Sequence, residues 1–140
     1  MQEKAFYYLA KSHIETGDTA TGDTYFLKVV DTNNSTKQIN EEIFDYFFFR
    51  KKYTEAIMAA KSLSKMDGSS DKPYVDMGNC YLLMGDTVQA IQQWEIAFEK
   101  FNGNYNIAMT ISGYYAGKGN QEKANYYYQK AVAYRQTHPK

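Results

Sequence analysis

The sequence of 140 residues contains few of the side chains that usually perform chemistry. Cys80 is the only cysteine, so no disulfide can form within the chain, and we expect this thiol to be a buried small hydrophobe. The two histidines, His13 and His138, lie near opposite ends of the sequence, and neither has the spacing of a metal ligand. No glycine-rich phosphate loop or nucleophile elbow is present. We therefore expect no catalytic residues, no metal and no cofactor.

Net charge is also lacking. Sixteen Lys and Arg residues balance sixteen Asp and Glu residues, and only Arg50 and Arg135 are arginines. Nucleic-acid binding draws its affinity from a positive field that releases counterions from the phosphates. Nucleic acid is therefore not an expected partner.

Long apolar runs are absent as well. The longest run, the phenylalanines at 47–49 with Ile43 and Phe44 before them, is interrupted by Asp45. A membrane span needs roughly 20 apolar residues, so we predict none and expect a soluble chain. The N-terminus lacks a signal-peptide core, yet this does not fix the compartment. The chain is cytoplasmic if it is complete and exported if a leader was removed.

What the sequence does contain is a repeat with a period of about 34 positions. Two stretches carry the same residue types in the same order: Gly78, Tyr81, Gly85, Asp86, Ala90, Trp94 and Ala97, then Ser112, Tyr115, Gly119, Asn120, Ala124, Tyr128 and Ala131. Stepping backwards by the same period gives four units, at 3–36, 37–70, 71–104 and 105–138. They account for nearly the whole chain, which we interpret as a single domain, 1–140.

A unit of this length accommodates two helices of about 14 residues and two short turns. Three units place a glycine, which tolerates the left-handed conformation that ends a helix, before a side chain that caps the next one. These pairs are Gly17-Asp18, Gly85-Asp86 and Gly119-Asn120. In the remaining unit Lys51-Lys52 replaces the pair. Residues 33–36 form a nominal glycosylation sequon, which an ordinary turn between repeats explains equally well.

This pattern resembles the tetratricopeptide repeat (TPR), with its small residues and aromatics at fixed places on two helices. Units three and four match best. In unit two, Phe44 stands where a small residue belongs, and in unit one Gly22 takes an alanine position. The second helix of unit one also holds three threonines, so we expect it to be the least stable. The resemblance implies an all-α, right-handed α-solenoid of four helix-turn-helix repeats, about eight antiparallel helices, that binds proteins or peptides without catalysis.

In proteins of this family the first helices line a concave groove that holds the partner. The corresponding positions predict a partner-binding groove formed by Lys4, Tyr7, Lys11, Glu41, Asp45, Phe48, Phe49, Lys72, Val75, Asn79, Leu82, Leu83, Met109, Gly113 and Gly117. Some members grip a peptide's terminal carboxylate with lysine and asparagine, but here Asp45 would repel that charge. Recognition of that kind is not expected.

Two features leave alternatives open. Gly113 and Gly117 lie one helical turn apart, and each costs about 1 kcal/mol relative to alanine inside a helix. A partner could approach that bare backbone. The alternatives are that a following segment packs there, or that the helix ends near Gly117. The C-terminal repeat is rich in tyrosine, which also suits homo-oligomerisation or docking of a missing portion: Tyr114, Tyr126, Tyr127 and Tyr134. A structural or oligomerisation module, or a regulatory segment of a larger protein, is thus the alternative function.

Overall fold

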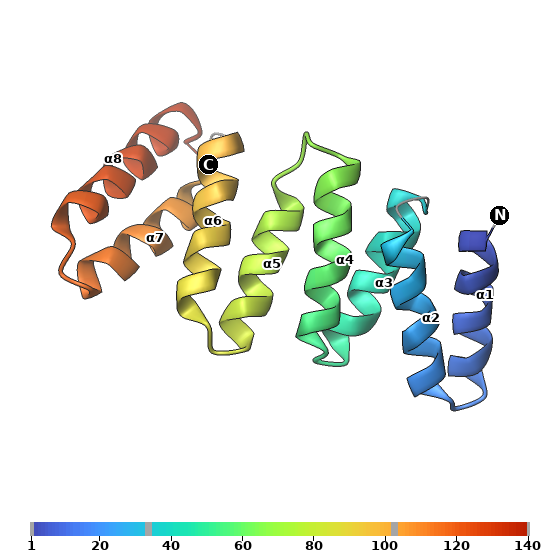
Figure 1. Cartoon of the computed structure of the whole chain (residues 1–140). Coiled ribbons are helices and arrows are strands. Elements are labelled where there is room, and N and C mark those ends of the chain that lie inside the picture. The colour runs from blue at the N-terminus through green and yellow to red at the C-terminus, as the bar shows by residue number, and fades with distance from the viewer. Residues whose placement is uncertain (1, 33–34, 102–103, 140) are drawn as a thin grey trace. The chain divides into compact units, whose positions relative to one another are not determined.

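A computed structural model describes residues 2–32, 35–101 and 104–139, which form eight α-helices and confirm the all-α prediction (Figure 1). The helices are α1 (Gln2–Glu15), α2 (Thr19–Asp31), α3 (Lys37–Phe49), α4 (Tyr53–Met66), α5 (Lys72–Leu83), α6 (Thr87–Phe101), α7 (Tyr105–Gly117) and α8 (Gln121–Thr137). Consecutive helices pack as four hairpins, as expected for a solenoid of this class. The asparagines of the nominal sequon, Asn33 and Asn34, lie outside the described residues.

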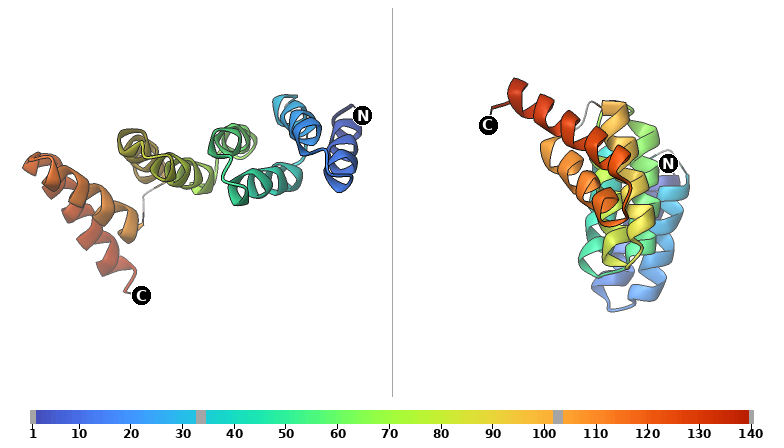
Figure 2. Two further views of the ribbon diagram at one scale, coloured as in Figure 1. Left: turned by 90° about the horizontal axis from the view of Figure 1, so that it is seen from below. Right: turned by 90° about the vertical axis from the view of Figure 1, so that its left-hand side faces the viewer.

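The chain forms two compact units. Unit 1 (Met1–Gly68) holds α1 to α4, and there α2 contacts both α3 and α4. Unit 2 (Ser69–Lys140) holds α5 to α8, and there α6 packs on α7. The antiparallel pairing of α7 with α8 is visible from two further directions in Figure 2. That the whole chain acts as a single domain stays a prediction.

Three of the hairpin turns are built as the sequence predicts. Gly17, Gly85 and Gly119 adopt φ values of 93°, 86° and 80°, which is the left-handed region that favours glycine. The Asp or Asn that follows accepts a hydrogen bond from the backbone N–H three residues on, at 3.1 to 3.2 Å. This satisfies one of the amide groups that every helix start leaves without a partner.

The turn between α3 and α4 is different. Lys51 takes the left-handed conformation with φ of 63°, where the other turns use glycine. Lys52 stands at the cap position of α4, yet among the described residues no side-chain hydrogen bond caps this helix. Its ammonium instead contacts Asp23 on α2 at 2.5 Å. The side chain that would cap α4 therefore ties the second hairpin to the first.

Asp23 is the centre of a polar cluster inside unit 1. Its side chain is only 8% exposed and accepts hydrogen bonds from Tyr46 at 2.6 Å and from Arg50 at 2.9 Å, besides Lys52. Burial alone would raise the pKa of Asp23, but the hydrogen bonds from Lys52 and Tyr46 and the two positive charges outweigh it, so the pKa is lowered. Burial and the bond to Asp23 raise the pKa of Tyr46 to about 12.

The interior of repeat 71–104 holds the small residues and the aromatic residue of the repeat pattern in close packing. Trp94 is buried on α6, while Ala90 and Ala97 beside it are fully buried and let the helices approach. A Cβ atom added at Gly78 on α5 would overlap the indole ring of Trp94. The indole N–H donates to the carbonyl of Val75 at 3.3 Å, so its burial leaves no polar group unpaired.

Repeat 37–70 fills the equivalent space from the other helix. One period before Gly78 and Trp94 stand Phe44 on α3 and Ala60 on α4, and both are buried. Phe44 stacks on Phe48 with ring centroids 5.5 Å apart. The large Phe44 is therefore accompanied by a small residue, Ala60, at the position that Trp94 occupies one repeat later.

Gly22 is also explained by close packing. A Cβ at this position on α2 would lie 2.5 Å from Cγ1 of Ile14 and 2.9 Å from the carbonyl oxygen of Ala10. Both atoms belong to α1, so glycine lets the two helices of this hairpin approach more closely than alanine would. Whether α2 is the least stable helix stays a prediction.

Candidate partner-binding surfaces

On unit 1, two of the predicted groove residues of α1, Tyr7 and Lys11, contact α3. The Tyr7 hydroxyl donates to Glu42 at 2.7 Å, and the Lys11 ammonium lies 3.3 Å from both the Tyr7 oxygen and Glu42. Burial, then the bond to Glu42, raises the pKa of Tyr7. The bonds to Tyr7 and Glu42 raise the pKa of Lys11. Lys11 thus has a local counter-ion, and Glu42 is a residue of this face that sequence reasoning missed.

The α3 end of unit 1 carries exposed aromatic surface. Phe49 is 77% exposed, and Phe48 is half-buried with its ring edge-on to Phe49 at 5.7 Å. The structure thus exposes the two phenylalanines that the sequence assigns to the groove. Among the other predicted residues of this unit, Lys4 and Asp45 are exposed and Glu41 is half-buried. Their part in binding stays a prediction.

On unit 2, a hollow of about 330 Å³ lies between α5 and α7, and it takes in three of the predicted groove residues. Its lining comprises Val75, Asn79, Leu82, Trp94, Asn106, Ile107 and Thr110. The side chains of Asn79 and Leu82 are exposed, and Val75 is half-buried. Apolar groups therefore form the floor and two amides stand at its side. Thr110 is a lining residue that the sequence prediction left out.

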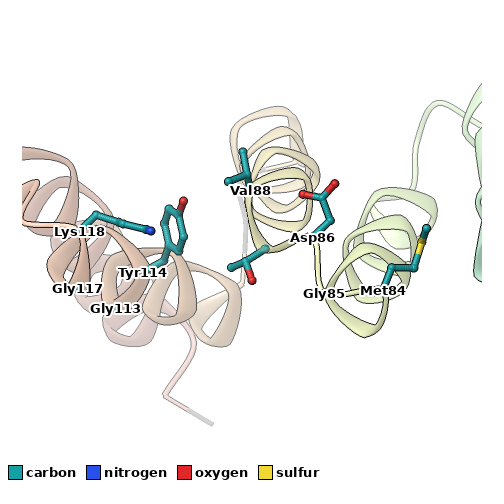
Figure 3. A pocket seen from close by; sticks show the side chains of 9 residues that line it. Met84, Gly85, Asp86, Val88, Gly113, Tyr114, Gly117 and Lys118 are labelled. Carbon is teal, nitrogen blue, oxygen red and sulfur yellow. The ribbon is translucent and has the colours of Figure 1, made fainter.

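A second and larger hollow, of about 690 Å³, lies between the α5–α6 turn and the end of α7 (Figure 3). Gly113 and Gly117 form part of its wall, and a Cβ at either would meet no described atom within 4 Å. The helix α7 ends at Gly117, which confirms one of the readings given above for that residue. Within the described residues no following segment covers Gly113.

The remaining predicted groove residues of unit 2 lie around these hollows. Leu83 on α5 is 54% exposed, and Met109 on α7 is half-buried against the core. Lys72 is exposed and its ammonium lies 2.7 Å from Asp76, one helical turn along α5. A pair of this kind on a helix surface contributes only a few tenths of a kcal/mol, roughly 0.3 to 0.5.

One residue of the proposed tyrosine-rich terminus is not where the sequence reasoning put it. Tyr127 is buried, and its hydroxyl donates to Glu95 at 3.0 Å, beside Tyr115 at 2.9 Å from the same oxygen. Burial and the negative charge of Glu95 raise the pKa of Tyr127. Tyr128, which the prediction omitted, is 47% exposed instead. It occupies the position of the buried Trp94 one repeat later, so the period alone would have predicted its burial and not its exposure.

The cysteine and the histidine considered above as candidates for chemistry, Cys80 and His13, pack against other side chains. Cys80 is fully buried, as predicted, and burial followed by the charge of Asp76 raises its pKa to about 12. His13 stacks on Tyr25 with ring centroids 5.7 Å apart. Among the described residues no three His, Cys, Asp or Glu side chains form a group able to hold a metal. None of the described helices is long and apolar enough to cross a membrane.

Comparison with known proteins identifies the repeat. A family model described as tetratricopeptide repeat matches residues 4–33, which is the hairpin of α1 and α2. Over this hairpin the chain matches the tetratricopeptide repeat family. The matched segment is the unit that the sequence pattern ranked below units three and four. Gly22 in the alanine position therefore does not hide the TPR signal.

Solved structures extend this TPR fold over the chain. A crystal structure of MamA has 20% sequence identity and a TM-score of 0.66, covering 98% of this chain and 80% of that one. MamA AMB-1 has 15% identity and a TM-score of 0.61, covering 96% of this chain and 73% of that one. No curated protein sequence matches the chain. At such identities the likeness shows the fold alone. TPR folds are generally protein-interaction modules and usually non-catalytic.

Proposed function

We propose that the chain is a non-catalytic interaction module that binds an extended, uncharged peptide segment on the α5–α7 face of unit 2. The observation that supports this is the hollow of about 330 Å³, whose apolar floor lies beside the amides of Asn79 and Asn106. Its volume is at the lower end of small-ligand pockets, which suits one or two side chains of a peptide.

The floor of this hollow provides affinity. Val75, Leu82 and Ile107 present aliphatic surface there, and Trp94 also lines the hollow. Burying a leucine-sized side chain from water contributes about 1.5 to 3 kcal/mol. The hollow is lined by no charged residue, and burying an unpaired charge is costly. An uncharged apolar side chain is therefore the preferred occupant.

The two amides provide direction. An extended peptide exposes its backbone N–H and C=O groups, and the side chain of asparagine both donates and accepts hydrogen bonds. Asn79 on α5 and Asn106 on α7 approach the hollow from different helices. In this proposal they bind the peptide backbone on either side of the buried side chain. Phe48 and Phe49 in unit 1 offer a separate apolar contact.

The test begins with selection of random dodecapeptides displayed on phage against the purified chain. We expect the enriched peptides to share an uncharged apolar residue. Their affinity, measured by fluorescence anisotropy, should fall about tenfold or more in Leu82→Asp, because the charge enters the apolar floor.

The matched control is Met58→Asp on α4, since Met58 is 41% and Leu82 46% exposed. This variant should bind the peptides as the wild type does. Equal affinity of wild type and Leu82→Asp, or a selection without enrichment, would refute the proposal. A loss in Phe49→Ala but not in Leu82→Asp would move the site to unit 1.

A further inference from the structure

The hollow between the α5–α6 turn and α7 is lined by projecting side chains on one side and by glycines, which have no side chain, on the other. On one side, Met84 at the turn and Val88 at the start of α6 project with about half of their surfaces exposed. On the other side, Gly113 and Gly117 present bare backbone with room for added atoms. Figure 3 shows these two groups on opposite sides of the hollow.

Charge follows the same division. Asp86 lies at the turn beside Met84, and Lys118 lies at the end of α7 beside Gly117 (Figure 3). Asp86 caps α6 through Gln89 N–H at 3.1 Å, and its side chain is exposed, as is that of Lys118. One side of the hollow thus carries the apolar Met84 and Val88 with the negative Asp86, and the other carries the positive Lys118, the ring of Tyr114 and the two glycines.

A two-fold rotation exchanges the two sides of such a patch. In an isologous interface residue i of one copy contacts residue j of the other, and j contacts i. We propose that this hollow is the contact surface between two copies of the chain. The turn of each copy enters the hollow of the other, so that Met84 packs on bare α7 backbone and Asp86 pairs with Lys118 of the second copy.

This contact is small. Stable dimers bury about 800 Å² on each partner, more than one hollow and its rim supply. The dimer is therefore expected to dissociate on dilution in the micromolar range. Each dimer contains the Asp86–Lys118 contact twice, which doubles the effect of any change in these charges.

The experiment is sedimentation velocity of the full chain at low and high micromolar concentration. The wild type should shift towards the dimer as its concentration rises. Asp86→Lys and Lys118→Asp should each remain monomeric, because each places like charges against one another in both contacts. An equal mixture of the two variants should dimerise, since a mixed pair restores an opposite-charge contact at both places.

Two further variants separate the contact from folding. Gly113→Leu replaces glycine in a helix by a better helix former and fills open space, so its melting temperature should rise while its dimer affinity falls about tenfold or more. Lys61→Asp, an equal charge change at an exposed position of α4, should dimerise normally.

A wild type that is monomeric at both concentrations, or a mixture of the charge variants that stays monomeric, would overturn the proposal. A wild-type dimer that both charge variants retain would place the interface elsewhere and also overturn it. None of these variants changes a residue of the smaller hollow. Peptide binding and self-association can therefore fail independently.

Discussion

Repeats 37–70 and 71–104 fill the same interior position with an aromatic ring from opposite helices. In the later repeat Trp94 on the second helix covers Gly78 on the first. In the earlier one the same two positions hold Phe44 on the first helix and Ala60 on the second, and both are buried. Each hairpin has one large and one small residue there. In these two repeats the space between the helices is therefore filled by one large side chain, which either helix can provide.

The turns of these two repeats differ in a related way. Gly85 and Asp86 give the later repeat a relaxed turn and a capped helix. Lys51 and Lys52 give the earlier one a left-handed lysine and a side chain directed to Asp23. Within the described residues the earlier turn therefore lacks the glycine and the helix cap that stabilise the later one, and has instead an ion pair between two hairpins.

The largest effect is expected when the large residue of repeat 71–104 is moved from its second helix to its first, as in repeat 37–70. This tests whether positions 78 and 94 share one interior space. Trp94→Ala should lower the free energy of unfolding by about 3 to 5 kcal/mol, because it leaves a cavity. Gly78→Phe should cost about 3 kcal/mol, because the new ring overlaps the indole. The double variant should lose less than the sum by about 2 kcal/mol, measured by urea denaturation.

The contrast variant is Gly113→Phe, which adds the same ring where no described atom lies within 4 Å. It should show no coupling with Trp94→Ala. Strict additivity of Gly78→Phe and Trp94→Ala would contradict the idea that the two positions share one volume.

Removing Asp23 breaks the link that compensates the earlier turn. Asp23→Asn should lower the free energy of unfolding by about 2 kcal/mol, less than for a fully buried pair, because Arg50 and Lys52 keep contact with water. The measurement is again urea denaturation, with Asp31→Asn on the same helix as the control. A loss as small as in that control would show that the cluster contributes nothing.

The Asp23 contribution has a defined pH dependence. The pKa of Asp23 is lowered in the folded state, so its contribution is present above the unfolded value of about 3.9 and is lost as the pH falls through the folded pKa. The stability difference between wild type and Asp23→Asn should therefore disappear in acid. A constant difference from neutral pH to pH ~2 would exclude this explanation.

Exchanging the turn residues has the smallest expected effect. Lys51→Gly should raise the free energy of unfolding by about 1 kcal/mol, because glycine takes a positive φ without strain. Gly85→Lys should lower it by a similar amount. Thermal unfolding measures the change in stability of each variant. A loss of stability in Lys51→Gly would mean that the lysine side chain itself stabilises the turn.

The sequence predicted those features that depend on local or periodic signals. The hairpins and the three glycine turns follow from residues repeated at a fixed spacing, and the burial of Cys80 follows from the character of a lone cysteine. These signals lie within one or two helical turns of sequence, where helix capping and the spacing of apolar residues on one helix face determine the local structure.

The features that the sequence did not reveal depend on contacts between hairpins. Asp23 meets Tyr46, Arg50 and Lys52 across more than twenty positions of the chain, and no repeated spacing marks the group. Glu42 pairs with Lys11 in the same non-periodic way. The hollows likewise depend on where side chains of separate helices end. The groove residues were assigned by resemblance, and their binding role stays a prediction.

Trp94 has one more consequence. It is the only tryptophan of the chain and it belongs to unit 2. Its emission therefore follows the melting of α5 to α8 and is largely blind to α1 to α4, whereas circular dichroism sees all the helices. Coincident curves from the two signals would mean that the halves unfold cooperatively, and separated curves would give each half its own midpoint.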